Sequence, residues 1–262
     1  MTRPIALTIS VLDPTGVVGI AADLAEFAGR NVHGAAAACA LTIPDRGGIK
    51  ELIHIPAELL AKQLTGVLAG APVAAVKTGL GLDGERAAIV ADHLHRFHAP
   101  RYVLDCSFRS ASSFMLARAD DIDVVKKRLL PLATVVFANR REVESLTGMA
   151  PQNEDEMVKA AGEIRAAGAG AVVILNGIEA GEQTVDLFFD GTQPMFLRAP
   201  RQRGRRIQGA GGRFAAAVVA DLALGTALPD AVVRAKRDTD KAIQAAAAGA
   251  SPDILEREPG EG

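Results

Sequence analysis

The sequence is poor in the residue types that mark secreted and zinc-binding proteins. Its 262 residues include no tryptophan, one tyrosine and only two cysteines, Cys39 and Cys106. Two cysteines are too few for a disulfide framework or a zinc site, which favours a reducing compartment. The N-terminus also lacks a charged region followed by an apolar signal core. We therefore expect a cytoplasmic protein.

Net charge and long apolar runs are equally scarce. The 29 basic and 31 acidic side chains give a formal charge of -2, so charge offers no reason to expect a nucleic-acid partner or an anionic membrane surface. The alanine-rich stretches are interrupted by Asp221 or by glycine and proline, which leaves no window of the ~18 uncharged apolar residues that a membrane span needs. We expect a small-molecule partner, with neither nucleic acid nor membrane involved.

Apolar residues are nevertheless abundant, at 49% of the chain, and they follow a regular pattern. Short β-branched runs at 4–11, 73–76, 102–104, 134–137 and 171–175 predict buried strands. Helices are predicted at 19–29, 56–69, 84–97, 121–130, 140–147, 154–167, 212–224 and 229–248. This alternation is typical of parallel strands joined by helices. We predict one α/β domain over residues 1–250, a three-layer α/β/α fold with a mostly parallel central sheet, and a polar tail over 251–262.

Residues 184–198 interrupt the alternation. The runs 184–191 and 195–198 flank the turn dipeptide Asp190-Gly191, a pattern typical of a β-hairpin. We therefore expect an antiparallel edge on the sheet.

Polar side chains and one glycine-rich turn follow the predicted strands. Because ligands of open α/β sheets bind at the carboxyl ends of the strands, polar residues at those points are candidate site residues. They are Asp13, Lys77 with Thr78, Asp105, Asn139 and Asn176. The turn Gly209-Ala-Gly-Gly212 leads directly into an alanine and valine helix. Small residues there allow backbone N–H groups to converge on an anion, which predicts a phosphate site.

The order and spacing of these segments resemble the ribokinase-like superfamily, and within it the hydroxymethylpyrimidine and phosphomethylpyrimidine kinases of thiamine synthesis. Residues 6–24, ALTISVLDPTGVVGIAADL, are similar to that family's opening signature. Four further segments stand where the family carries Lys-x-Gly-Met, an Asp-ended strand, Asn-x-x-Glu and Gly-Thr-Gly-Cys. They are Val76-Lys77-Thr-Gly79-Leu80, Val103-Leu-Asp105, Ala138-Asn139-Arg-Arg-Glu142 and Gly209-Ala-Gly211. The resemblance extends to about residue 248 and implies a ribokinase-like fold.

The resemblance also implies a role for each matched position, with ATP and Mg²⁺ as cofactors. The substrate pocket would be formed by Asp23, Pro44, Leu80, Asp105 and Cys106, with Asp23 bound to an aminopyrimidine. The nucleotide contacts would be Lys77, Asn176 and Arg213. Asn139 and Glu142 would hold the hydrated Mg²⁺ that bridges the phosphates of ATP. The N–H groups of Gly209, Ala210, Gly211 and Gly212 would stabilise charge on the transferred phosphoryl group.

Simpler interpretations stay open for several of these residues. Asn139 is also a typical helix N-cap, with Glu142 as its capping-box partner. Lys77 would equally serve to brace the end of the sheet. A free cysteine after a strand, such as Cys106, is most often a small buried hydrophobe. The five histidines show no ligand spacing that predicts a metal site.

Three positions depart from the family pattern. Gly212 stands where the pyrimidine kinases have the cysteine, and the wider superfamily the aspartate, that is taken as the base. Asn176 replaces a phosphate-contacting lysine, and Pro44 replaces a glutamine of the flap. Arg213 and the arginine run at 201–206 are candidates to supply the missing positive charge.

We expect ATP-dependent phosphorylation of a hydroxymethylpyrimidine-type substrate or its monophosphate, at a rate reduced by the missing base. A base contributes typically ~10²–10⁴-fold, and an acceptor that is already a phosphate needs none. One alternative is a pseudokinase that binds a pyrimidine or nucleotide without turnover. Another is a kinase for a pyridoxal-type vitamin. The family resemblance further implies a homodimer.

Overall fold

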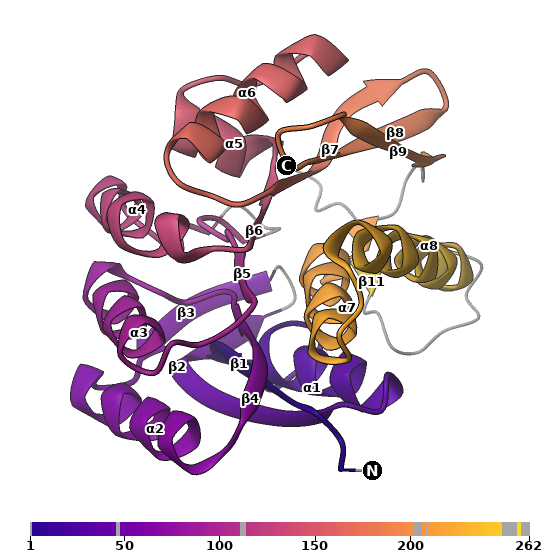
Figure 1. Ribbon diagram of the computed structural model, residues 1–262. Helices are drawn as coiled ribbons and strands as arrows, with labels where there is room; N and C mark the ends of the chain where they lie inside the picture. The colour runs from indigo at the N-terminus through magenta and orange to yellow at the C-terminus, as the bar shows by residue number, and fades with distance from the viewer. Residues whose placement is uncertain are drawn as a thin grey trace.

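The structure is a computed structural model that describes residues 2–45, 48–110, 114–201, 206–207, 209–247 and 256–257. Its main sheet has nine strands in the order β3-β2-β1-β4-β5-β6-β7-β8-β9 (Figure 1). The parallel strands are β1 (Ile5–Leu12), β2 (His33–Asp45), β4 (Val73–Thr78), β5 (Tyr102–Asp105), β6 (Val135–Asn139) and β7 (Val172–Ala180). The predicted parallel centre is confirmed.

Antiparallel strands stand at both edges of this sheet. β8 (Gln183–Phe189) and β9 (Met195–Pro200) form the predicted hairpin, and β8 also pairs antiparallel with β7. At the other edge, β3 (Gly48–His54) pairs antiparallel with β2. The prediction missed β2 and β3, because residues 35–38 of β2 are all alanine. Alanine favours helix intrinsically, and here pairing with β1 outweighs that preference.

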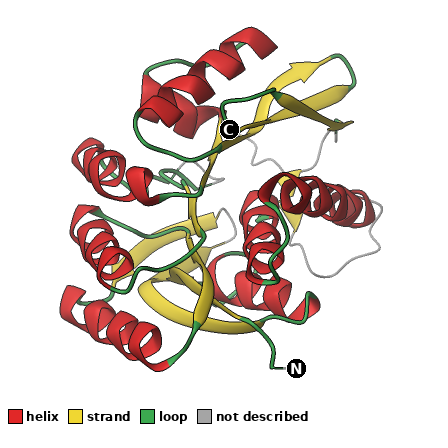
Figure 2. Ribbon diagram, in the orientation of Figure 1, coloured by secondary structure: helices red, strands yellow, loops and turns green. Residues whose placement is uncertain are grey.

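Helices cover both faces of the sheet (Figures 1 and 2). One face carries α2 (Ala57–Gly70), α3 (Gly84–Arg96), α4 (Ala119–Val124), α5 (Arg140–Thr147) and α6 (Glu154–Ala166). The opposite face carries α1 (Gly19–Gly29), α7 (Ala210–Ala223) and α8 (Leu228–Ala247). Each face has its own apolar core. The three-layer α/β/α arrangement is therefore confirmed.

One of the predicted helices is only partly regular. After α4 the chain continues as a π-helical turn (Val125–Leu129) and a 3-10 turn (Leu130–Leu132), so the predicted helix at 121–130 is regular only in its first part. On the other face the edge of one ring meets the face of the other between Phe137 and Phe214, with centroids 5.2 Å apart. Among the described residues, no helix is both long and apolar enough to cross a lipid bilayer.

The end of the chain is described only in part. β10 (Arg206–Ile207) pairs antiparallel with β11 (Glu256–Arg257). The rest of the predicted polar tail at 251–262, and residues 202–205 of the arginine run, lie outside the described residues.

Candidate active site

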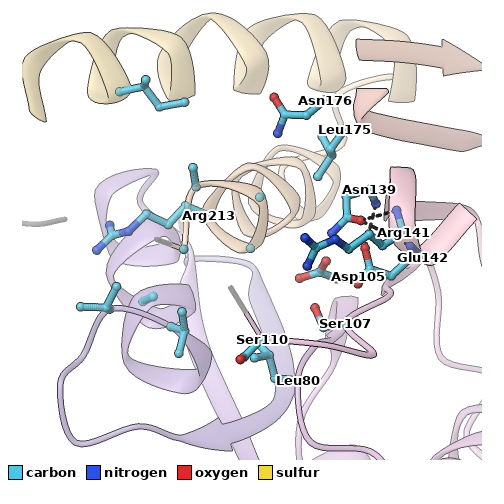
Figure 3. Close-up of a pocket in the computed structure, with 18 of the residues that line it drawn as sticks. Leu80, Asp105, Ser107, Ser110, Asn139, Arg141, Glu142, Leu175, Asn176 and Arg213 are labelled. Carbon is cyan, nitrogen blue, oxygen red and sulfur yellow. Dashed lines mark hydrogen bonds between the residues drawn. The ribbon is translucent and has the colours of Figure 1, made fainter. Parts of the chain in front are cut away.

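A cleft of about 960 Å³ lies at the carboxyl ends of the parallel strands (Figure 3). Its walls come from the turn after β1, the ends of β4 to β7, the starts of α1, α5 and α7, and one face of α8. It brings together all but one of the residues to which the family resemblance assigns a role. They are Asp23, Pro44, Lys77, Leu80, Asp105, Asn139, Glu142, Asn176, Gly209, Ala210, Gly211, Gly212 and Arg213.

Cys106 is the exception. It is not among the described residues that line the cleft, and only 5% of its surface is exposed because it packs in the core beneath α3 and α5. Burial raises the pKa of its thiol well above the usual value, with smaller contributions from Glu142 and Asp105. This burial favours the interpretation of Cys106 as a buried hydrophobe over a substrate contact.

The glycine-rich turn forms the uncapped start of α7. Gly209 has a φ of 78°, and no side chain hydrogen-bonds to the first turn of the helix. The first intrahelical bond runs from the Arg213 N–H to the Gly209 carbonyl at 2.9 Å. The N–H groups of the first turn therefore have no partner among the described residues. Together with the helix dipole, they provide an anion site.

A buried group of charges lies beside this turn. The Lys77 ammonium is 3.1 Å from Asp23 Oδ1 and 3.1 Å from Asp105 Oδ2. The Thr8 hydroxyl also donates to Asp23 Oδ2 at 2.5 Å. Burial raises the pKa of Asp23, although Lys77 opposes the shift. Burial alone would lower the pKa of Lys77, but the two carboxylates outweigh it and raise that pKa.

This ion pairing bears on the two roles considered for Lys77, a nucleotide contact and a brace for the end of the sheet. An ammonium that is 1% exposed and held between two carboxylates neutralises them. The geometry thus favours the brace over the direct nucleotide contact.

Asn139 and Glu142 begin α5 as a complete capping box. Asn139 Oδ1 accepts from the N–H groups of Arg141 (2.8 Å) and Glu142 (3.3 Å), and Glu142 Oε2 accepts from the Asn139 N–H at 3.2 Å. Glu142 is 2% exposed. Burial, and next the charge of Asp105, raises the pKa of Glu142 to about 7. A buried carboxylate with this pKa gains from a nearby cation, so the residues fit a metal as well as a cap.

Asn176 stands in a break of β7. Its φ of 45° is left-handed, and the pairing of β7 with β8 shifts register between Ile174 and Ile178. The Asn176 N–H donates to Asp186 Oδ1 at 2.7 Å, and Asp186 Oδ2 lies 2.9 Å from the Lys236 ammonium. A bulge of this kind turns a side chain out of the strand pattern, here into the cleft.

Arg213 and Arg201, two arginines considered as sources of positive charge for the nucleotide phosphates, are each paired with a glutamate. Arg213 pairs with Glu26 of α1 at 3.3 Å, and its side chain points away from the side of the cleft that holds Asp105 (Figure 3). Arg201 pairs with Glu179 at 2.8 Å. Of the rest of the arginine run, only the backbone of Arg206 is described.

Four basic residues that the sequence analysis did not select line the cleft, one of them Arg109 in the segment after β5. Arg140 and Arg141 lie on the first turn of α5, inside the Asn-x-x-Glu segment, and Lys236 lies on α8. The signal for the two α5 arginines was present in that motif. The sequence around Lys236 gave no indication of a site, because it has the pattern of an ordinary amphipathic helix.

Among the described residues, no group of three or more His, Cys, Asp or Glu side chains converges to hold a metal. A cation in the cleft would therefore depend on few protein ligands, as Mg²⁺ with water and phosphate oxygens does.

Comparisons with known proteins identify the family of the chain. Residues 13–252 match the phosphomethylpyrimidine kinase family. The hydroxymethylpyrimidine/phosphomethylpyrimidine kinase of Rhizobium meliloti (strain 1021) is 37% identical over 243 residues, which cover 92% of this chain and 91% of the relative.

Two solved structures share the fold over nearly the whole chain. The pyridoxal kinase from Staphylococcus aureus in complex with pyridoxal has a TM-score of 0.84 at 29% identity, and the match covers 93% of this chain and 89% of that one. The same enzyme is known in complex with ADP and with AMP-PCP. The phosphomethylpyrimidine kinase from Clostridium difficile 630 has a TM-score of 0.81 at 25% identity, covering 92% and 100%.

Proposed function

The chain belongs to the phosphomethylpyrimidine kinase family, a family of ATP-dependent kinases, and from this premise we propose that it phosphorylates hydroxymethylpyrimidine and its monophosphate. The observation that carries the proposal is the uncapped N-terminus of α7, which opens into a cleft of about 960 Å³ at the carboxyl ends of the strands. Backbone donors placed there stabilise charge that develops on a transferred phosphoryl group.

The pyrimidine and the nucleotide would bind to different walls of the cleft. Asp23, Pro44 and Leu80 form the wall that would take the pyrimidine, with Asp23 as the acceptor for its amino group. Asn176, Arg141 and Lys236 form the opposite wall, where the nucleotide would bind. Held between these walls, the acceptor oxygen and the phosphoryl group react as neighbours, and positioning of this kind contributes much of the rate in phosphoryl transfer.

Asn139 and Glu142 are the residues that would hold Mg²⁺. Burial, and next the charge of Asp105, raises the pKa of Glu142, so a cation beside this carboxylate would be favoured. When bound, Mg²⁺ would offset the negative charge of the ATP phosphates. Because both residues also cap α5, the same contacts that start the helix fix the two side chains in place.

A pyridoxal-type vitamin is the second candidate substrate. The observation in its favour is the match to the pyridoxal kinase of Staphylococcus aureus, at a TM-score of 0.84. Pro44 and Leu80 are the positions at which the two substrate classes would be distinguished, because both line the pyrimidine wall and neither offers a side-chain hydrogen bond.

The proposed function predicts ADP formation when the purified chain is offered ATP, Mg²⁺ and hydroxymethylpyrimidine monophosphate. We expect the monophosphate to react faster than the alcohol, because a phosphate acceptor carries its own negative charge and needs no base. Hydroxymethylpyrimidine and pyridoxal, offered in parallel, identify the preferred acceptor. Binding of ATP and the pyrimidine without ADP formation would instead identify a pseudokinase and contradict the proposal.

We also propose a cytoplasmic location. The support is that Cys39 and Cys106 are both buried and form no disulfide, as expected in a reducing compartment.

The proposed assembly is a homodimer formed through the β2–β3 hairpin. Leu12, Leu41 and Ile53 are paired across β1, β2 and β3, so they lie side by side on one face of the sheet, and Ile43 continues that face. All four are more than a third exposed. A contiguous apolar patch of this kind is typical of an interface between subunits.

This assembly predicts that Leu41→Glu converts a dimer to a monomer in sedimentation equilibrium. A charge buried in the interface without a partner costs several kcal/mol, which corresponds to a rise of at least ~100-fold in the dissociation constant. Leu59→Glu is the matched control, since Leu59 is also exposed but lies on α2, outside the patch. A native chain that sediments as a monomer would contradict the proposal.

A further inference from the structure

At Gly212 the start of α7 directly faces Asp105. Among the described residues outside this turn of α7, the heavy atom within 4 Å of a Cβ added to Gly212 is Asp105 Oδ2, in ordinary van der Waals contact at 3.7 Å. Gly211, one residue earlier, would instead meet Leu175 at 3.1 Å. The start of α7 therefore faces Asp105 at an ordinary contact distance at Gly212, whereas it packs tightly against Leu175 at Gly211.

Asp105 is held rigidly opposite this turn of α7. It is the last residue of β5, only 6% exposed, and its carboxylate is fixed by the ion pair with Lys77 at 3.1 Å. Oδ2 accepts no hydrogen bond of good geometry from the other described residues. The side chain points into the cleft (Figure 3). A buried carboxylate oxygen with accepting capacity left thus faces the anion site of α7.

We propose that Asp105 is the catalytic residue that accepts the proton of an alcohol substrate. The inference rests on the proposed function. The substrate hydroxyl, placed between Asp105 Oδ2 and the start of α7, forms the new bond to the γ-phosphorus of ATP while the bond to the ADP oxygen breaks. The hydroxyl proton passes to Oδ2 and is then released to solvent, so the reaction yields ADP, the phosphate ester and one proton.

The ion pair with Lys77 is compatible with this role. Phosphoryl transfer passes through a loose transition state in which the proton leaves late, and an aspartate accepts the substrate proton in protein kinases as well. Lys77 is also shared with Asp23, so the three groups together keep a net negative charge. The ammonium of Lys77 also reduces the repulsion between Asp105 and the phosphoryl group.

The other acidic groups at this point of the cleft already have hydrogen-bond partners. Glu142 Oε2 accepts from the Asn139 N–H, and Glu142 is the residue that would hold Mg²⁺. Asp23 is bonded to both Thr8 and Lys77 and is 1% exposed. Asp105 is the acidic residue within 4 Å of the position of a Gly212 side chain.

The test is Asp105→Asn, assayed with both pyrimidine acceptors. We expect the rate with the alcohol to fall by ~10²–10⁴-fold, the usual contribution of a general base, and the rate with the monophosphate to change by less than about tenfold. The monophosphate rate also reports whether the variant is folded. Asp221→Asn is the matched control, because Asp221 is a fully buried, ion-paired aspartate of α7 that does not line the cleft. It should leave the ratio of the two rates unchanged.

A rescue experiment completes the test. In the Asp105→Asn background, Gly212→Cys places a new acceptor at the same point of the cleft and should restore the alcohol rate by at least about tenfold. In the native background the same change should raise the alcohol rate little, because Asp105 already accepts the proton.

Three outcomes would overturn the inference. They are an alcohol rate that survives Asp105→Asn, an equal loss of both rates in that variant, and a native chain that phosphorylates the monophosphate but not the alcohol. A native chain that phosphorylates neither pyrimidine would refute the proposed function itself, and with it this inference.

Discussion

Lys77→Met is expected to lower the free energy of unfolding by ~3–5 kcal/mol at pH 8, the usual result of removing one partner from a buried ion pair. The substitution nearly preserves the volume of the side chain but leaves Asp23 and Asp105 buried side by side without their cation. Two like charges in a poorly solvated site repel each other and cannot both stay ionised at low cost. Chemical denaturation measures the loss.

The same variant should show a distinctive dependence on pH. Burial already raises the pKa of Asp23 above its usual 3.8 in the native chain, and Lys77 is the main opposing influence. Without Lys77 the folded-state pKa rises further. A carboxyl group with a raised folded-state pKa favours the folded state below its unfolded pKa, and this contribution is lost as pH rises through the folded value. The deficit of Lys77→Met should thus be small near pH 4 and largest at pH 8.

Lys62→Met serves as the control for this substitution. Lys62 pairs with Glu58 one helical turn away, and both side chains are mostly exposed. Exposed pairs of this spacing contribute only ~0.3–0.5 kcal/mol. A Lys77 variant that unfolds at the same denaturant concentration as the native chain, at pH 4 and pH 8 alike, would show that the buried ammonium is dispensable.

Gly209→Ala is expected to reduce kcat by ~10²–10³-fold, comparable to the loss of one donor from an oxyanion hole. Gly209 adopts a φ of 78°, which disfavours an alanine by ~1–2 kcal/mol. A Cβ atom would also lie 2.4 Å from the Val17 carbonyl oxygen, so the backbone has to move. Such a movement displaces the N–H groups that begin α7. Steady-state kinetics with the monophosphate acceptor measures the effect.

Gly225→Ala separates strain from displacement. Gly225 follows the other end of α7, has a φ of 87° and has no neighbouring heavy atom within 4 Å of an added Cβ. It therefore carries the same left-handed strain without a clash. We expect a similar loss of stability, ~1 kcal/mol, with kcat unchanged. If Gly209→Ala kept kcat within threefold of the native value, the anion site would have to lie elsewhere.

Local pattern was enough to predict the centre of the fold. Helix 19–29 and the β8–β9 hairpin follow from apolar spacing and from one turn dipeptide, both of which are local properties. The β2–β3 hairpin was missed because its strands depend on partners that are distant in sequence, such as β1. A strand made largely of alanine has no local signal of its own.

Much of the site was predictable, but not the pairing of its charges. The positions after the strand ends converge because parallel strands end at one edge, which sequence order alone indicates. Whether Lys77 faces a phosphate or two carboxylates, and whether Arg213 faces the cleft or Glu26, depends on side-chain geometry that no motif encodes. No motif indicates that Gly212 faces Asp105 either, because the two residues are more than a hundred positions apart in the sequence.

Gly209 lies close to Val17, nearly two hundred residues earlier in the chain, and this has a consequence for synthesis. The anion site exists only after the ribosome has released α7 and that helix has docked beside α1. Ten of the fourteen residues of α7 are buried, in the core that holds Phe27 and Phe137. Until α7 arrives, the part of this face that α1 does not cover is an exposed apolar surface. The unfinished protein is therefore inactive and exposes apolar residues that the finished protein buries.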